Sequence, residues 1–457
     1  MNHQDIKSDL DAVTTVLSFD QTVALDPVIA IENTQGMLAV APQNLTEIAA
    51  VFDICNTTGT PLIPHGGRTG LAGAAAASGS EVMMLGTKMP NILKVDPVSQ
   101  IVHVSANTTL LDLEAAVRLY GLTVGIDLAA RDSATIGGML STNAGGMEAH
   151  RNGTMRERVL GLEAVMPNGT VLSDLAHVRK CNEGYDVKQL LIGAEGTLGV
   201  ITSATLQLLP ETAAPSTFLM ALPDTATALN ELRTLQGSSH IQVLRAEAMW
   251  HSFATENAKL QKVNPLEALP DAPLYVIYEV NVSQGVAEEV VFETLEHHFA
   301  SGAILEAVAA QSLQQAEDTW QLREDTMSLG IVFPNSVSFD VSVPLAQLDA
   351  FVKKVEKRIA ALNAGLVIHV LGHLGDGNLH YSIVSDCDIS DALHSLIKPA
   401  VLDGLKDISG SFSAEHGIGT EKRDALQKYG DAGKLKLNRM IKQMFDPNNI
   451  CNPGKVL

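Results

Sequence analysis

Short apolar runs and one amphipathic stretch alternate along the first part of the chain. Apolar runs of about four to eight residues are typical of buried β-strands, and they occur at residues 37–42, 60–64, 82–86, 92–97 and 101–107. Residues 44–59 show helical spacing of apolar positions, with Asn44 as an N-cap and Glu47 three residues further on. Asn168 and Gly169 predict the turn of a β-hairpin.

The pattern changes after two prolines, Pro210 and Pro215, which mark an expected domain boundary. Beyond them, apolar strands alternate with amphipathic helices. The strands are expected at residues 217–222, 274–281, 338–344, 366–373 and 379–385. This order predicts an α+β sheet with its helices on one side.

Composition and charge exclude several classes of protein. The chain of 457 residues carries 31 Lys and Arg against 52 Asp and Glu, a net charge of −21, which disfavours binding to nucleic acids or anionic membranes. It contains no apolar run long enough for a transmembrane helix and no secretory signal pattern at its start. Its four cysteines form no C-x-x-C pair, which fits a reducing compartment. We therefore expect a cytoplasmic protein with no membrane span and no nucleic-acid partner.

Three glycine-rich segments lie at residues 64–73, 134–146 and 190–210, and the third of them ends in an apolar strand. The chain lacks a P-loop, a G-x-G-x-x-G that opens a helix after a strand, and an H-E-x-x-H motif, so the corresponding sites are not supported. Glycines let a backbone bring its N–H groups against a bound phosphate. A flexible loop is the alternative for the first segment, and close packing of a strand against a helix is the alternative for the second.

These segments carry a resemblance to a known family. PHGGRTGLAG, GIDLAARDSATIGGMLSTNAGG, GYDVKQLLIGAEGTLGVIT and the closing FDPNNICNPGK resemble the FAD-linked oxidases of the vanillyl-alcohol oxidase type. Within that superfamily the chain resembles the D-2-hydroxyacid dehydrogenases, which act on D-lactate, glycolate or D-2-hydroxyglutarate. The resemblance implies non-covalent FAD, with covalent attachment at His65 as the alternative. It implies contacts to the cofactor from Gly66, Gly67, Arg68, Thr69, Gly70, Ser133, Gly137, Gly138, Thr142, Gly145, Gly146, Val200, Ile201 and Asn452.

The resemblance also implies an α+β architecture in three parts. Residues 1–212 would form an FAD domain of two subdomains, of the vanillyl-alcohol oxidase/p-cresol methylhydroxylase type. Residues 213–425 would form a substrate- and metal-binding cap with a ferredoxin-like antiparallel sheet. Residues 426–457 would form a tail that packs back on the FAD domain.

Two histidines flank a turn in GHLGDGNLH. Gly375 to Asn378 form a strong turn sequence, and a hairpin closed there would pair His373 with His380. Opposed residues lie on one face of a sheet, so both imidazoles could then bind one metal ion. Two surface histidines beside a turn are the alternative.

A third ligand for such a metal has to come from elsewhere, and SAEHGIG offers Glu415 and His416. Two histidines and a carboxylate leave coordination positions open, as in catalytic sites. By resemblance to the family, His373, His380 and Glu415 would bind a divalent metal, usually zinc, and His416 would be the catalytic base.

Arg323 lies in the sequence TWQLREDTM. From the sequence alone it could be a surface residue paired with a neighbouring acid, whereas the family places this arginine against the substrate carboxylate. Two positions depart from the members that use dicarboxylates: Ser338 stands where they often have Lys, and Ser382 where they often have Asn. The identity of the hydroxy acid therefore stays open.

The expected reaction is oxidation of a D-2-hydroxy acid to a 2-oxo acid, with hydride transfer to flavin N5. Electrons would pass on to a flavoprotein or a quinone, and the chain would form a homodimer. Two alternatives remain: a non-catalytic FAD-carrying subunit of a glycolate-oxidase-like complex, and a metal-dependent hydrolase with glycine-rich loops.

Overall fold

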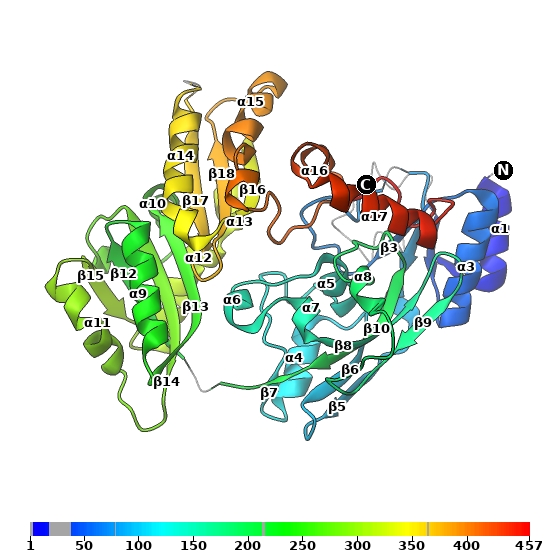
Figure 1. Ribbon diagram of the computed structural model, residues 1–457, viewed down its shortest axis with the longest axis horizontal. Coiled ribbons are helices and arrows are strands. Elements are labelled where there is room, and N and C mark those ends of the chain that lie inside the picture. Colours follow the sequence, from blue (N-terminus) through cyan, green and yellow to red (C-terminus); the bar gives the residue numbers. More distant parts are fainter. Residues whose placement is uncertain (1–2, 18–37, 78, 213–214, 363–364) are drawn as a thin grey trace. The chain divides into compact units, whose positions relative to one another are not determined.

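The computed structural model describes residues 3–17, 38–77, 79–212, 215–362 and 365–457 (Figure 1). The chain divides into two compact units. Unit 1 consists of Met1–Gly146, Asn152–Glu211 and Glu415–Leu457, and unit 2 of Met147–Arg151 and Thr212–Ala414. The last crossing between the units, after Ala414, lies eleven residues before the expected boundary at 425, since 425 − 414 = 11. Residues Met147–Arg151 belong to unit 2, although the sequence analysis placed them within the FAD domain, residues 1–212.

The first sheet of unit 1 is parallel at its centre. Its strand order is β1-β2-β4-β3, with β2 and β3 parallel to β4 and β1 antiparallel to β2. The strands are β1 (Thr15–Leu17), β2 (Leu38–Ala41), β3 (Leu62–His65) and β4 (Val82–Leu85). Helix α3 (Leu45–Thr58) begins where it was predicted, because the Asn44 side chain accepts a hydrogen bond from the Glu47 backbone N–H.

The second sheet of unit 1 is antiparallel, in the order β5-β6-β10-β8-β9. Its strands are β5 (Leu93–Asp96), β6 (Ile101–Ser105), β8 (Val159–Val165), β9 (Val171–Asp174) and β10 (Val200–Gln207). The predicted turn between β8 and β9 is confirmed: Met166 N–H donates to Thr170 O, and Gly169 has a φ of +78°. A separate small pair joins β7 (Leu122–Thr123) to β11 (Leu209–Pro210).

Helices and the tail complete unit 1. The helices that lie wholly in this unit, besides α3, are α1 (His3–Val13), α4 (Leu110–Arg118), α5 (Ile136–Thr142), α7 (Met155–Arg158), α8 (Lys188–Leu191), α16 (Arg423–Tyr429) and α17 (Ala432–Phe445), whereas α6 (Ala149–Asn152) spans the crossing. After α17 the chain returns to β3, where Leu62 N–H donates to Ile450 O and Asn452 N–H donates to Leu62 O. Ile450 and Cys451 are buried in the core of the first sheet.

Unit 2 is built on one seven-stranded antiparallel sheet, drawn in green to orange in Figure 1. Its order is β15-β12-β14-β13-β17-β18-β16. The strands are β12 (Ser216–Leu222), β13 (Ile241–Trp250), β14 (Leu274–Val282), β15 (Glu306–Ala309), β16 (Ser336–Ser342), β17 (Val367–His373) and β18 (Asn378–Val384). The sequence did not predict β13, although this strand lies at the centre of the sheet.

The expectation that the helices cover one side of this sheet is wrong. Along β12, alternate residues face two different cores: Phe218 packs with α9 and α11, whereas Leu219 packs with α10, α12 and α13. The helices of unit 2 are α9 (Thr225–Gly237), α10 (His251–Ala258), α11 (Val290–Ala300), α12 (Leu313–Glu324), α13 (Thr326–Val332), α14 (Leu348–Ala360) and α15 (Asp391–Leu402). Within the described ranges, no helix has both the length and the apolar character needed to cross a membrane.

One carboxyl group in the core of unit 2 has no hydrogen-bond partner. Glu231 on α9 is fully buried, and neither of its carboxylate oxygens is hydrogen-bonded within the described part of the chain. Its nearest basic group is His298, whose Nδ1 lies 4.0 Å from Oε1. Burial, and secondarily the charge of Asp224, raises the pKa of Glu231 from 4.5 to about 8.

Glu231→Gln is expected to stabilise the protein in a pH-dependent way. Because the folded pKa is above the unfolded one, the protonated carboxyl contributes stability that is complete below pH about 4.5 and is lost as the pH rises through about 8. The midpoint of thermal unfolding should therefore be nearly equal for both proteins at pH 5 and a few degrees higher for the variant at pH 9. An equal difference at both pH values would show that Glu231 is ionised in the folded state throughout.

Candidate functional site

The first two glycine-rich segments of unit 1 lie in direct contact. A Cβ atom on Gly67 would lie 1.8 Å from the carbonyl oxygen of Ser133, and one on Gly66 would lie 2.5 Å from Thr135 Oγ1. The Gly67 backbone N–H donates to Thr135 Oγ1 at 3.2 Å. The loop that follows β3 and the start of α5 can approach this closely only because these positions are glycine.

The third segment and the tail meet the same loop. Gly196 lies against Pro64, because a Cβ atom there would be 2.7 Å from the proline ring. Asn452 is buried, and its amide N–H groups donate to Glu195 O at 2.8 Å and to Ala74 O at 3.1 Å. All three glycine-rich segments and Asn452 are therefore gathered in unit 1.

The remaining predicted cofactor residues also lie in unit 1. Gly137 packs tightly against Ala106 at the end of β6, as the structural alternative for this segment required. Thr142 donates its hydroxyl to Gly138 O within α5. The others lie in the loop after β3 (Arg68, Thr69, Gly70), after α5 (Gly145, Gly146) and at the start of β10 (Val200, Ile201).

Buried polar atoms without partners show that these residues fit a polar ligand. Within the described residues, Asn452 Oδ1, Asn107 Oδ1 and His65 Nδ1 are buried and accept no hydrogen bond. The other ring nitrogen of His65, Nε2, lies 3.1 Å from Ala75 O. Burial, followed by the charge of Arg68, lowers the pKa of His65 to about 4, so the ring is neutral. This combination of glycine-lined backbone and unused acceptors fits the dinucleotide that the resemblance implies.

In unit 2, His373 and His380 come together, but in a different register from the one predicted. His373 pairs with Asn378 and Leu371 with His380, so the two histidines are diagonal neighbours on one face of the sheet. The loop closes between His373 and Gly377, since Gly377 N–H donates to His373 O and Gly377 has a φ of +76°. The turn therefore lies one residue earlier than predicted.

The two rings nevertheless converge. Their Nε2 atoms lie 3.5 Å apart, and the ring planes are nearly perpendicular. Two nitrogens bound to one tetrahedral zinc ion at about 2.0–2.1 Å would be separated by roughly 3.3–3.4 Å. The pair therefore fits a shared metal ion. The nearby Asn378 amide is buried, and neither its oxygen nor its nitrogen has a partner within the described chain.

Glu247 on β13 contacts the Nδ1 side of the His373 ring, and the sequence analysis did not identify it. It pairs directly with His373 across the sheet, and its carboxylate accepts from His373 Nδ1 at 2.6 Å and from Arg323 Nε at 2.8 Å. Burial opposes its ionisation, but His373 and Arg323 outweigh that effect and hold the pKa of Glu247 below its usual value. A glutamate inside the apolar run AEAMW was the available signal. Arg323 is thus buried and paired with Glu247, not with a sequence neighbour at the surface.

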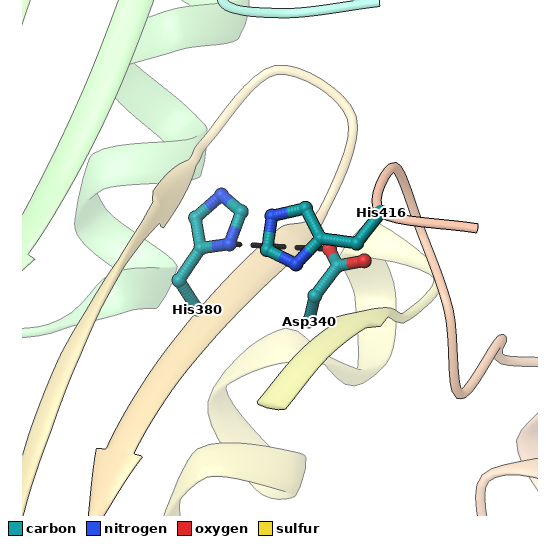
Figure 2. A group of neighbouring side chains, drawn as sticks. All are labelled: Asp340, His380 and His416. Carbon is teal, nitrogen blue, oxygen red and sulfur yellow. Dashed lines mark ion pairs between the residues drawn. The ribbon is translucent and has the colours of Figure 1, made fainter. Parts of the chain in front are cut away.

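Asp340 on β16 is the acidic residue next to His380, and the two are directly paired on adjacent strands. Its Oδ1 is 3.9 Å from His380 Nδ1, and it is almost fully buried. Its Oδ2 accepts from the backbone N–H of Ala414 at 3.1 Å. Figure 2 shows Asp340 and His380 on neighbouring strands, where the two residues are directly paired. Asp340 therefore fixes the end of the segment that leads to Glu415 and His416.

Glu415 and His416 themselves belong to unit 1. The Glu415 carboxylate accepts from the Gly146 backbone N–H at 3.0 Å. Beyond His416, the backbone N–H groups of Ile418 and Gly419 donate to Glu195. His416 is therefore held on both sides by short anchored segments.

The two departures from the dicarboxylate pattern fall at one place. Ser338 and Ser382 are directly paired across β16 and β18. Since side chains two residues apart share a face, both serines share a face with Asp340 and His380. The two substitutions therefore change the same patch of the sheet.

Comparison with known families accounts for both units. Residues 37–174 match the FAD binding domain family, and residues 212–456 match the family of FAD linked oxidases, C-terminal domain. The D-2-hydroxyglutarate dehydrogenase of Stutzerimonas stutzeri (strain A1501) is 31% identical over 429 residues, which are 91% of this chain and 90% of that protein. The mitochondrial D-2-hydroxyglutarate dehydrogenase of Rattus norvegicus is 32% identical over 426 residues, 91% of this chain and 77% of that protein.

Solved structures confirm the predicted fold. p-Cresol methylhydroxylase with substrate bound superimposes with a TM-score of 0.74 at 16% identity, covering 99% of this chain and 96% of that one. An alkyldihydroxyacetonephosphate synthase gives a TM-score of 0.73 at 18% identity, over 99% and 86% of the two chains. The chain therefore has the fold of p-cresol methylhydroxylase, and it belongs to the FAD linked oxidases, in the D-2-hydroxyacid dehydrogenase family.

Proposed function

We propose that this protein oxidises a D-2-hydroxy acid to the 2-oxo acid with a divalent metal, FAD and His416 as general base. The observation that carries the proposal is the group formed by His373, Glu247 and Arg323. Both the imidazole that would bind the metal and the guanidinium that would bind the substrate anion contact one buried carboxylate. The dehydrogenase names of the relatives support the same class of reaction.

The metal would be held by His373, His380 and Glu415. In the tautomer that donates Nδ1–H to Glu247, Nε2 of His373 carries the lone pair through which the ring would bind a metal ion. A bound zinc ion would supply positive charge that favours ionisation of the substrate hydroxyl. Glu415 would be the carboxylate ligand, and three protein ligands would leave a coordination position for the substrate.

Arg323 would bind the substrate carboxylate. Its Nε donates to Glu247 Oε2 at 2.8 Å, and the guanidinium carries two further amino groups that could bind a substrate anion. Two parallel N–H donors suit a carboxylate. Their orientation is fixed by the Nε contact, so little side-chain entropy is lost on binding.

His416 would take the proton of the substrate hydroxyl. The C2–H bond then breaks with its electron pair, and the C–O bond becomes a carbonyl. FAD, which the glycine-rich segments and Asn452 would hold, would supply the acceptor for that pair. Reoxidation by a flavoprotein or a quinone, the cytoplasmic location and the homodimer stay predictions.

The substrate side chain would meet Ser338 and Ser382. These two hydroxyls carry no charge, so this patch offers no counter-ion for a second carboxylate. We therefore propose a monocarboxylic hydroxy acid such as D-lactate as a better substrate than D-2-hydroxyglutarate.

A substrate panel with a dye as electron acceptor tests this function. We expect the purified yellow protein to reduce the dye with D-lactate, and more weakly with D-malate and D-2-hydroxyglutarate, but not with L-lactate. Removal of metal by a chelator should lower the rate at least a hundredfold, and zinc should restore it. Equal rates with both lactate enantiomers, or full activity in protein free of metal by elemental analysis, would contradict the proposal.

A further inference from the structure

Glu247 is buried at the centre of the unit 2 sheet, where a charge is costly unless it is paired. Its side chain is 0% exposed. An unpaired buried carboxylate would destabilise the fold strongly, but here each oxygen has its own donor. Arg323 on α12 and His373 on β17 supply the two N–H groups, at 2.8 Å and 2.6 Å.

We propose that Glu247 is a positioning residue that sets both the arginine for the substrate carboxylate and the histidine for the metal. The inference rests on the proposed function, since it assigns the roles of Arg323 and His373 from it. Glu247 acts through these two side chains and contacts neither substrate nor metal.

Glu247 prepares His373 for a metal ion by favouring the tautomer with its proton on Nδ1. A carboxylate that accepts the Nδ1 proton keeps Nε2 deprotonated and fixes the plane of the ring. Glu247 and His373 are also directly paired on adjacent strands, so the sheet itself holds the distance between them. Loss of such a partner behind a ligating histidine typically weakens metal binding about 10- to 100-fold.

Glu247 orients Arg323 through its second carboxylate oxygen, Oε2, which accepts from Arg323 Nε. Contact at Nε holds the guanidinium on Glu247, and this fixes the direction of its two terminal amino groups, which are the donors suited to an anion. A carboxylate can accept at both oxygens, whereas the amide of glutamine accepts at one and donates at the other. Glu247→Gln can therefore accept from Arg323 only by turning its NH2 group toward His373 Nδ1, and this places the ring proton on Nε2, where the metal ion would bind.

The test compares the zinc affinity and the KM of Glu247→Gln with those of the wild type. Zinc affinity is measured by competition with a chromophoric chelator, and flavin content reports whether unit 1 is intact. We expect a 10- to 100-fold weaker zinc affinity, a KM raised about tenfold or more, and unchanged flavin content. Glu231→Gln, the same change at another fully buried glutamate of unit 2, should leave both zinc affinity and KM at the wild-type values.

A double-mutant cycle separates a positioning role from a general loss of packing. In an Arg323→Met background, Glu247→Gln should raise KM much less than it does alone, because its route to the substrate has gone. The loss of zinc affinity should persist in that background. Equal effects on KM with and without Arg323 would overturn the link to the arginine.

The outcomes distinguish the two proposals. Wild-type protein that binds zinc, with Glu247→Gln within threefold of it in both affinity and KM, overturns the inference alone. Wild-type protein without zinc affinity removes the metal from the proposed function, and the inference falls with it. Should Glu247→Gln fail to fold, Glu247→Asp replaces it. The aspartate side chain is one methylene shorter and cannot contact both Arg323 and His373. A zinc affinity and a KM within threefold of wild type in this variant would again overturn the inference.

Discussion

His416→Asn is expected to lower kcat about 10²- to 10⁴-fold, the usual range for loss of a general base. The amide of asparagine keeps a hydrogen-bonding side chain of similar size but cannot take up the proton of the substrate hydroxyl. The side chain is neither a proposed metal ligand nor a proposed flavin contact. Zinc content and flavin content should therefore stay at wild-type levels while the rate of flavin reduction falls in stopped-flow measurements.

The matched control for this variant is His394→Asn. His394 lies on α15 and is exposed to solvent, so the same substitution should change neither kcat nor cofactor content. If His416→Asn retained kcat within a few-fold of wild type, another group would have to accept the proton. If it lost zinc as well, His416 would have to be reassigned as a metal ligand.

Local chemistry explains which elements could be predicted from the sequence. The start of α3 depends on Asn44 and Glu47, three residues apart, and the β8–β9 hairpin depends on Asn168 and Gly169. In both cases the signal and the structure lie within a few residues. The spacing of the glycine-rich segments along the sequence does not predict that they lie together in the fold. Only the resemblance to a known family predicted this.

The histidine pair shows how a correct expectation can follow from a wrong detail. The turn was placed one residue too late, which would have made His373 and His380 directly opposed. The actual register makes them diagonal neighbours, and long side chains on one face can still meet at that spacing. The rings can converge as long as both residues lie on the same face of the sheet. Because side chains alternate between the two faces, pairing His373 with Asn378, two residues before His380, keeps both histidines on that face.

Glu247 could not be found from sequence because its role depends on distant partners. It lies 76 residues from Arg323 and 126 from His373, on a strand that the pattern did not predict. Its neighbours in the chain are apolar, so the local pattern suggests only an acid in an unfavourable place. The net charge of −21 was equally uninformative about this point, because the buried acid is matched locally by Arg323 and His373.

Gly67→Ala is expected to abolish FAD binding. The added methyl group would lie 1.8 Å from the carbonyl oxygen of Ser133 and 3.2 Å from the Cα atom of Ala134. Both are backbone atoms, so no side-chain rotation can relieve the clash, and the loop after β3 has to separate from the segment before α5. The two segments would then no longer present their N–H groups to one dinucleotide. We expect less than about one tenth of the wild-type flavin absorbance per protein, and a lower midpoint of thermal unfolding.

The control for Gly67→Ala is Gly86→Ala, because it adds the same methyl group to unit 1 without a clash. At Gly86 the new Cβ would lie 3.6 Å from the side chain of Asn107, an ordinary contact. This variant should therefore bind FAD like the wild type. Full flavin content in Gly67→Ala would mean that the two loops can separate without loss of the cofactor, and it would contradict the proposal that their contact forms the site. Flavin lost from both variants would instead point to general sensitivity of unit 1. Loss from Gly67→Ala alone ties FAD to the meeting of residues 66–67 with residues 133–138.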